Sequence, residues 1–202
     1  MTTCVPHLAL AIAHFFTAIQ ACLDDGGTLT YGRLDSSNIS GPVYLDFIPY
    51  SDLEHVLCAV KASLKPGTFV SFEFTTVSPD IPFLSDSFVF CSLPFMPRRY
   101  FKHDGLPRRT SMPLLISLHR VIELLTSAAC PLFIETVKNV TSEHITAFGA
   151  LHEALARDRI LRSGSIQKWG ERGWKEHRFM IAWERALLTA GYLTKWIVVA
   201  RK

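Results

Sequence analysis

Hydrophobic residues recur every three or four positions near the N-terminus, and this spacing predicts an amphipathic helix over residues 6–23. A short strand over residues 28–34 follows it. The apolar run Val43 to Ile48 predicts a buried strand, and a helix that runs to about Leu64 follows. The β-branched and aromatic residues 68–76 predict a further strand. Two strands joined by a helix predict a right-handed parallel crossover.

The later part of the chain continues this alternation after a proline-rich segment, residues 77–112, which we predict to be irregular. The pattern then predicts a helix over 112–129 and a strand over 132–140. Two more helices, over 143–161 and 176–190, are separated by a glycine-rich stretch. The last strand covers 192–200. This order indicates an α/β fold with an open, doubly wound sheet, mostly parallel, in which the terminal strand is antiparallel.

The composition narrows the class of protein. Hydrophobic residues make up 49% of the 202 residues and charged residues 19%, which favours one well-buried domain over residues 1–202. A net charge of +3 is too small to predict a nucleic-acid partner. The run of residues 8–23 is too short and too polar for a membrane-spanning segment.

The cysteines give no sign of a metal site or of a disulfide framework. Five are scattered along the chain, and no two form a Cys-x-x-Cys pair. An odd, scattered set is typical of reduced thiols in an intracellular protein. We therefore expect no metal and a cytoplasmic location.

Candidate catalytic residues lie where the predicted parallel strands end, because open α/β sheets bind ligands at that edge. Glu54 and His55 come after the strand at 43–48, and either can serve as an acid or base. Glu54 also suits the first turn of a helix through the helix dipole, whatever its chemistry. Glu73 lies between two phenylalanines, so it faces solvent, has a partner or borders a pocket.

Other polar and aromatic residues have ordinary structural explanations. His144 and His152 share one helix only loosely and have no further metal ligands beside them, so both are interpreted first as surface histidines. The tryptophans are interpreted first as core or as a hydrophobic wall; they are Trp169, Trp174, Trp183 and Trp196.

The segment YLDFIPYSDLEHVLCAVKASLKPGTFVSFEFTT, residues 44–76, resembles the fourth strand, the next helix and the fifth strand of class I S-adenosylmethionine-dependent methyltransferases. The stretches Leu53 to Val56 and Leu64 to Gly67 carry most of this match. Residues 112–202 are similar to the branch that resembles cyclopropane fatty acid synthase. The resemblance implies a Rossmann-like methyltransferase domain that is truncated at its N-terminus. Residues 1–76 would be its core, 77–111 a cover loop and 112–202 the acceptor side with the closing strands.

The resemblance also implies roles for particular residues. Glu54 falls where the branch has a catalytic glutamate, Glu73 near a histidine and His144 near a tyrosine of the pattern. With these, His55 is a catalytic candidate, and His144 and Trp169 are candidates for substrate binding. Asp35 falls where an acidic residue often lies near the adenine of S-adenosylmethionine. The implied reaction is methyl transfer to a small-molecule or lipid-like acceptor.

The sequence departs from the family in its N-terminal part, because it has no Gly-x-Gly and Gly26-Gly27 follows a predicted helix. Three hypotheses result: a methyltransferase, an inactive methyltransferase-like subunit that regulates a partner, and another activity on the same scaffold. Without the family's first strands, the strand Val43 to Ile48 has an open edge. The strand at 28–34 can pair with this edge, or a second chain can, which predicts a homo- or hetero-oligomer.

Overall fold

The structure, a computed structural model, describes residues 42–46, 48, 50–92, 95, 113–128 and 131–202. The predicted helix at 6–23, the predicted strand at 28–34 and Asp35 lie outside this part. The described elements follow one another in the order β1 (Val43–Tyr44), α2 (Tyr50–Ser63), β2 (Phe69–Val77), α3 (Asp86–Ser92), α4 (Leu118–Thr126), β3 (Phe133–Asn139), α5 (Thr141–Arg157), α6 (Arg159–Thr189) and β4 (Leu193–Arg201).

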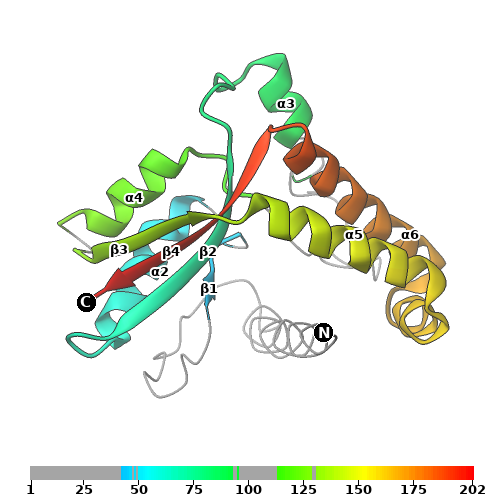
Figure 1. The fold of residues 1–202 in the computed structure, drawn as a ribbon, viewed down its shortest axis with the longest axis horizontal. Coiled ribbons are helices and arrows are strands. Elements are labelled where there is room, and N and C mark those ends of the chain that lie inside the picture. The colour runs from blue at the N-terminus through cyan, green and yellow to red at the C-terminus, as the bar shows by residue number, and fades with distance from the viewer. Residues whose placement is uncertain (1–41, 47, 49, 93–94, 96–112, 129–130) are drawn as a thin grey trace.

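The strands form one four-stranded sheet in the order β1-β2-β4-β3 (Figure 1). β1 is parallel to β2, whereas β4 is antiparallel to both of its neighbours, β2 and β3. The ladder between β2 and β4 covers nine residues of each strand, from Phe69 opposite Arg201 to Val77 opposite Leu193. The predicted α/β sheet with an antiparallel terminal strand is therefore confirmed.

One face of the sheet packs on α2 and α4. The side chains of Phe72 and Phe74 point to this face and are fully buried. In α2 the buried residues Leu53, Val56, Leu57 and Val60 recur at helical spacing and pack into the same core. The predicted helix after β1 is therefore confirmed, with its end at Ser63.

A second core lies at the other end of the molecule, where α3 and α6 pack against the last residues of β2 and the first of β4. It contains Val77, Phe88, Cys91, Phe95, Met180, Leu187, Leu188 and Leu193. Figure 1 shows α5 and α6 extending together from this end of the sheet. No helix in the described ranges is long and apolar enough to cross a membrane.

Two predicted boundaries between 77 and 129 were wrong. The segment 77–112 is not irregular throughout, because α3 forms at Asp86–Ser92, and the Ser85 hydroxyl accepts a hydrogen bond from the Phe88 amide at 3.2 Å. The next helix, α4, begins at Leu118 instead of residue 112. Leu114 instead forms an isolated parallel β-bridge with Thr76 of β2, and its amide donates to the Thr75 carbonyl at 2.8 Å.

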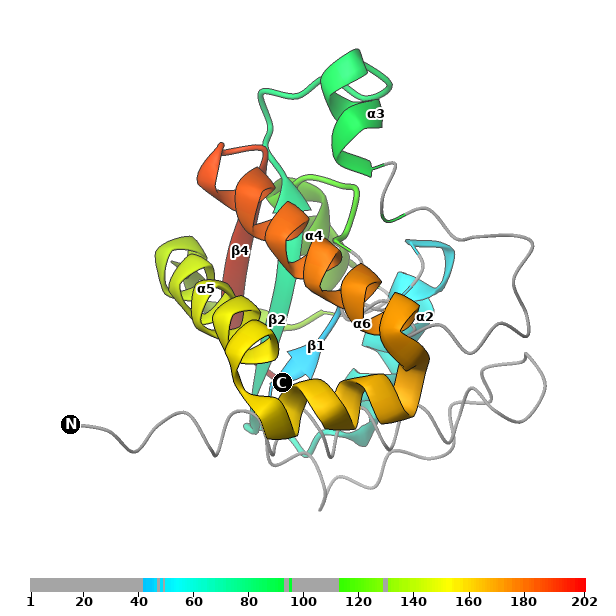
Figure 2. The ribbon, with the colours of Figure 1, turned by 90° about the vertical axis from the view of Figure 1, so that its right-hand side faces the viewer.

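The glycine-rich break predicted between the last two helices was also wrong. The first helix ends at Arg157, because the Asp158 carboxylate caps the next one by accepting hydrogen bonds from the amides of Ile160 and Leu161 at 2.8 and 3.2 Å. α6 then continues through the glycines and bends at Gly170, whose φ is 72°. Figure 2 shows its two segments meeting at a steep angle.

β1 is shorter than the predicted strand at 43–48. After Tyr44 the chain turns, and the Ile48 amide donates to the Leu45 carbonyl at 3.0 Å. β1 lies at one edge of the sheet as far as the structure describes it. Pairing of this edge with a second chain stays a prediction.

Candidate functional site

A buried carboxylate lies just beyond the end of β1. The turn after Tyr44 directs Asp46 into the protein, where only 2% of the residue is exposed. Its carboxylate accepts hydrogen bonds from the backbone amide of Thr75 and, at 3.0 Å, from the Thr75 hydroxyl. Asp46 thus fastens the end of β1 to the middle of β2.

The partner of this carboxylate comes from the far end of the chain. Lys195 lies opposite Thr75 in the ladder between β2 and β4, and its Nζ donates to Asp46 Oδ2 at 2.6 Å. The same Nζ lies 3.4 Å from Glu73 Oε1. Asp46, Glu73 and Lys195, the buried charge cluster, therefore link three neighbouring strands with two negative charges and one positive charge.

The electrostatics of the cluster decide its chemistry. Burial lowers the pKa of the Lys195 ammonium, because it disfavours the charged form. The negative charges of Asp46 and Glu73 have the larger effect and hold this pKa above the ordinary value. Lys195 therefore stays protonated and cannot act as a nucleophile or as a general base. It acts as a fixed cation that holds two carboxylates in place.

The charges of this cluster also shift the pKa of two further titratable groups. Burial, and then the charge of Glu73, raise the pKa of the Tyr44 phenol. Burial, and then the charge of Lys195, lower the pKa of His144 to about 3. His144 lies in the first turn of α5, with its ring 4.1 Å from that of Phe148. Because its pKa is low, His144 is a neutral imidazole at physiological pH.

The residues predicted as catalytic do not come together in one group. Glu54 and His55 lie in α2, and both are exposed, whereas Glu73 belongs to the buried charge cluster. A carboxylate in an apolar strand is expected to have a partner, and the partner of Glu73 is Lys195. Sequence reasoning missed Asp46 and Lys195, although each is a charged residue within a predicted apolar strand, and that pattern was the available signal.

The other predicted residues lie along α5 and α6. Trp169 is half-buried, with its ring 5.1 Å from that of His177. Trp174 is buried, and its Nε1 donates to the Leu155 carbonyl at 3.0 Å, which joins α6 to α5. His152 is half-buried on α5. No group of His, Cys, Asp and Glu in the described residues could hold a metal ion.

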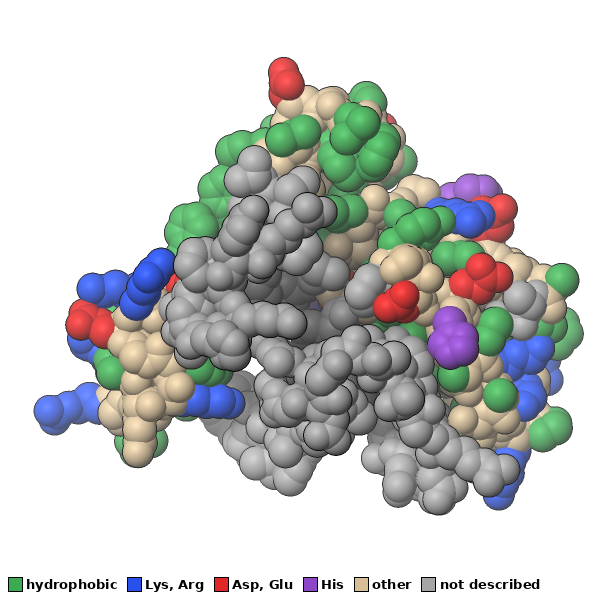
Figure 3. Space-filling model, turned by 180° about the vertical axis from the view of Figure 1, so that it is seen from behind, with side chains coloured by type: hydrophobic (Ala, Val, Ile, Leu, Met, Phe, Trp, Pro, Cys, Tyr) green, Lys and Arg blue, Asp and Glu red, His purple; other side chains and the backbone are tan. Residues whose placement is uncertain are grey.

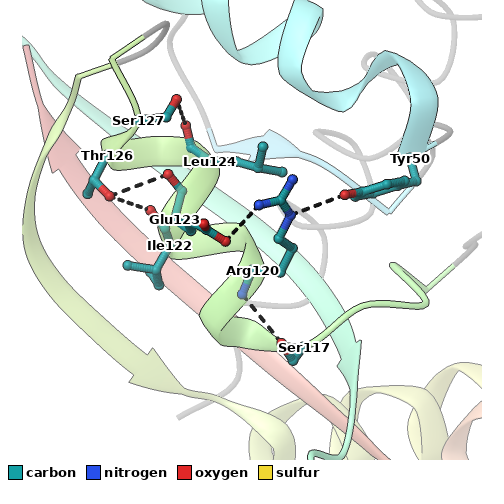
Figure 4. Close-up of polar contacts among 8 residues, drawn as sticks. All are labelled: Tyr50, Ser117, Arg120, Ile122, Glu123, Leu124, Thr126 and Ser127. Carbon is teal, nitrogen blue, oxygen red and sulfur yellow. Dashed lines mark hydrogen bonds and ion pairs between the residues drawn. The ribbon is translucent and has the colours of Figure 1, made fainter. Parts of the chain in front are cut away.

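A polar contact at the surface fixes the start of α2. Arg120 of α4 donates from Nε to the Tyr50 hydroxyl at 3.1 Å and from Nη1 to Glu123 at 2.7 Å (Figure 4). These contacts raise the pKa of Arg120, and Arg120 lowers the pKa of Glu123. Because the pair is exposed, it contributes little stability. It does hold α4 beside the first turn of α2, where Glu54 follows.

The chain is similar to known proteins in its structure but not detectably in its sequence. No protein-family model and no curated protein matches the sequence. A cyclopropane synthase of Mycobacterium tuberculosis, MmaA2, matches 92% of the chain at 14% identity with a TM-score of 0.59. The mycolic acid cyclopropane synthase CmaA1, bound to S-adenosylhomocysteine and CTAB, matches the same share at 12% identity, also with a TM-score of 0.59.

A third neighbour belongs to another group of methyltransferases. Phosphoethanolamine N-methyltransferase 2 of Haemonchus contortus, in complex with phosphomonomethylethanolamine and S-adenosylhomocysteine, matches 79% of the chain at 17% identity with a TM-score of 0.54. The chain covers 33% of this enzyme and 66% of each cyclopropane synthase. These three likenesses show that this chain has the fold of class I S-adenosylmethionine-dependent methyltransferases, as in the cyclopropane synthases.

Proposed function

We propose that this chain is a methyltransferase that transfers a methyl group from S-adenosylmethionine to a small-molecule or lipid-like acceptor, if necessary with a partner chain. The likeness of its fold to that of the cyclopropane synthases, at a TM-score of 0.59, carries this proposal. The neighbours are named for phosphoethanolamine and for mycolic acid, which supports an acceptor from either of these chemical classes.

In this proposal Glu54 is the residue that orients or deprotonates the acceptor. Its exposure in α2, just after the end of β1, leaves its carboxylate accessible to a ligand at the edge where open sheets bind them. His55 stands next to it as a second titratable group. Glu73 contributes a carboxylate that Lys195 holds in place. His144 contributes a neutral imidazole, and Trp169 contributes an apolar wall for the acceptor.

Transfer of a labelled methyl group tests the proposal. The full chain is incubated with methyl-labelled S-adenosylmethionine and either phosphoethanolamine or vesicles of an unsaturated phospholipid. Labelled product is expected, and Glu54→Gln should lower kcat by about 10²- to 10⁴-fold, because it removes the acid–base group. Glu153→Gln, at an exposed position on α5, should leave kcat unchanged. Equal rates for both variants would contradict the role of Glu54.

The second candidate is an inactive subunit that regulates a partner. Two observations on the expected methyl-donor contacts favour it. The sequence has no Gly-x-Gly. The acidic side chain at the end of β1, Asp46, already has Thr75 and Lys195 as partners for its oxygens. The Asp46 carboxylate is thus already engaged by the protein itself and is not offered to a methyl donor. Asp35, a predicted contact of the donor, lies outside the described residues.

Calorimetry distinguishes the two candidates. For the inactive subunit we expect no saturable heat when S-adenosylmethionine is titrated into the full chain, and no labelled product. Saturable binding in the micromolar range, together with transfer that depends on Glu54, would exclude the inactive subunit.

A further inference from the structure

The corner between α5 and α6 has a larger formal positive charge than the chain as a whole. Residues 157–175 contain six basic and two acidic side chains, a formal charge of +4. Since the whole chain has a net charge of +3, all other residues together have a charge of −1. We call residues 157–175 the basic arm; they comprise the corner, the first segment of α6 and the five residues after its bend at Gly170.

The basic arm projects from the rest of the described protein. Figure 1 shows the ends of α5 and α6 that carry it far from the sheet, and in Figure 2 its helical segment lies nearest the viewer. In the space-filling view, several Lys and Arg side chains lie on the lobe that α5 and α6 form at the left (Figure 3). Its charges are therefore presented to solvent on a protruding surface.

Exposed aliphatic side chains lie at the tip of the arm, between its arginines. Ile160 is 82% exposed and Leu161 is 45% exposed, and Arg159 and Arg162 stand on either side of them. Their backbone amides are held by Asp158, so the two apolar side chains are fixed in the first turn of a helix. Leaving Ile160 in water does not stabilise the fold, so its side chain is available to an apolar partner.

The inner side of the arm is held by the rest of the hairpin. Trp174 donates to the Leu155 carbonyl at 3.0 Å, and the guanidinium of Arg162 lies 4.7 Å from the centre of the Trp174 ring. The Nζ of Lys168 lies 5.1 Å from the centre of the Trp169 ring. The arm is thus an ordered scaffold that presents both its charges and its apolar tip in a defined arrangement.

We propose that the basic arm docks this protein on an anionic lipid surface, with Ile160 and Leu161 in the boundary between headgroups and acyl chains. Basic side chains around a short apolar insertion complement a layer that has negative headgroups outside and hydrocarbon beneath. The phosphates of a nucleic acid would engage the arginines but leave the aliphatic tip in water. The inference depends on the hairpin alone and does not require methyl transfer.

Vesicle sedimentation with the full chain tests the proposal. The protein is mixed with vesicles of phosphatidylcholine, with or without about one third phosphatidylserine, at about 0.1 M salt. We expect at least tenfold tighter binding to the anionic vesicles, and release from them at about 0.5 M salt. Failure to bind anionic vesicles, or equal binding to neutral ones, would overturn the proposal.

Two pairs of substitutions separate the charged and the apolar contributions. Arg159→Gln with Arg172→Gln should weaken binding to anionic vesicles about tenfold to thirtyfold, because each basic side chain near such a surface contributes about fivefold. The charge-preserving pair Arg159→Lys with Arg172→Lys should restore it. Ile160→Ser with Leu161→Ser should weaken the binding that remains at high salt.

The matched controls lie outside the basic arm. Lys65→Gln with Lys138→Gln removes the same charge from exposed positions, and Phe69→Ser with Phe133→Ser removes exposed apolar side chains. Both pairs should bind vesicles like the wild type. Unchanged binding by folded arm variants, verified by circular dichroism, would overturn the proposal. So would binding of a double-stranded oligonucleotide in place of anionic vesicles.

Discussion

At the scale of single residues, the buried charge cluster has a cost and a benefit. Burying Asp46 and Lys195 removes both from water, and the attraction between them offsets this loss only with good geometry. What the pair adds is alignment, because Lys195 of β4 reaches past β2 to Asp46, two residues beyond the end of β1. We infer that the cluster sets how β1 lies on β2.

Removing the cation should be strongly destabilising. Lys195→Met leaves Asp46 and Glu73 close together without a positive charge, so the free energy of unfolding should fall by about 3–5 kcal/mol. Urea unfolding of the purified variant measures this change. Lys138→Met, at an exposed lysine of β3, should change it by less than about 0.5 kcal/mol. Similar losses in both variants would show that the charge cluster has no special role.

Part of this cluster could be predicted from the sequence. A glutamate between two phenylalanines of a strand requires a partner or a pocket, and Glu73 has the partner. The identity of that partner could not be predicted, because Lys195 is distant in the sequence. The pairing depends on β4 lying next to β2, which no local pattern encodes.

At the scale of elements, the central strand pair was the most predictable feature. The β-branched and aromatic residues of 68–76 predicted β2 to within one residue at each end. The errors lie where one residue redirects the backbone. Asp158 ends one helix and starts the next, and Gly170 bends α6 without interrupting it. Periodicity does not distinguish a glycine that bends a helix from one in a loop.

The predicted burial of β2 can be tested on its two faces. Phe72→Ala should lower the free energy of unfolding by about 3–5 kcal/mol, because Phe72 is fully buried and leaves a cavity. Phe69→Ala in the same strand should cost less than about 1 kcal/mol, since Phe69 is 61% exposed. Chemical denaturation of both variants provides the measurement. An effect of Phe72→Ala below about 1 kcal/mol would contradict the core as described.

Two glycines of α6 should respond to alanine in opposite directions. Gly170 has φ of 72°, so Gly170→Ala should destabilise the protein by about 1–2 kcal/mol. Gly164 lies in the helical part of the arm with open space at its Cβ position, so Gly164→Ala should stabilise by up to about 1 kcal/mol. Thermal unfolding compares the two. A gain in stability for Gly170→Ala would show that the bend is not required.

At the scale of the whole molecule, the two long helices α5 and α6 each contain a histidine whose pKa is low. Burial lowers the pKa of His177, in α6, to about 4, and burial and then Lys195 lower that of His144 to about 3. Both imidazoles are neutral in the folded protein near neutral pH. The unfolded chain takes up these protons at about pH 6.5.

The protein should therefore lose stability in mild acid. As the pH falls from about 6.5 towards 4, the unfolded chain binds more protons than the folded protein. Each histidine then lowers the free energy of unfolding by up to about 1.4 kcal/mol per pH unit. Urea unfolding between about pH 7 and pH 5 measures the slope. The double variant His144→Gln with His177→Gln should have a shallower slope, and an unchanged slope would contradict this origin.

The order of the strands in space has a consequence for how the chain assembles. β4 lies between β2 and β3 but follows both in the sequence, so these two strands leave a gap that residues 193–201 fill last. Until that segment inserts, a nascent chain exposes the unpaired backbone of both neighbours. Assembly should therefore be slow, since the decisive contacts are remote in sequence. In a crowded preparation, a β4 strand donated by another molecule would fill the same gap and give a swapped dimer.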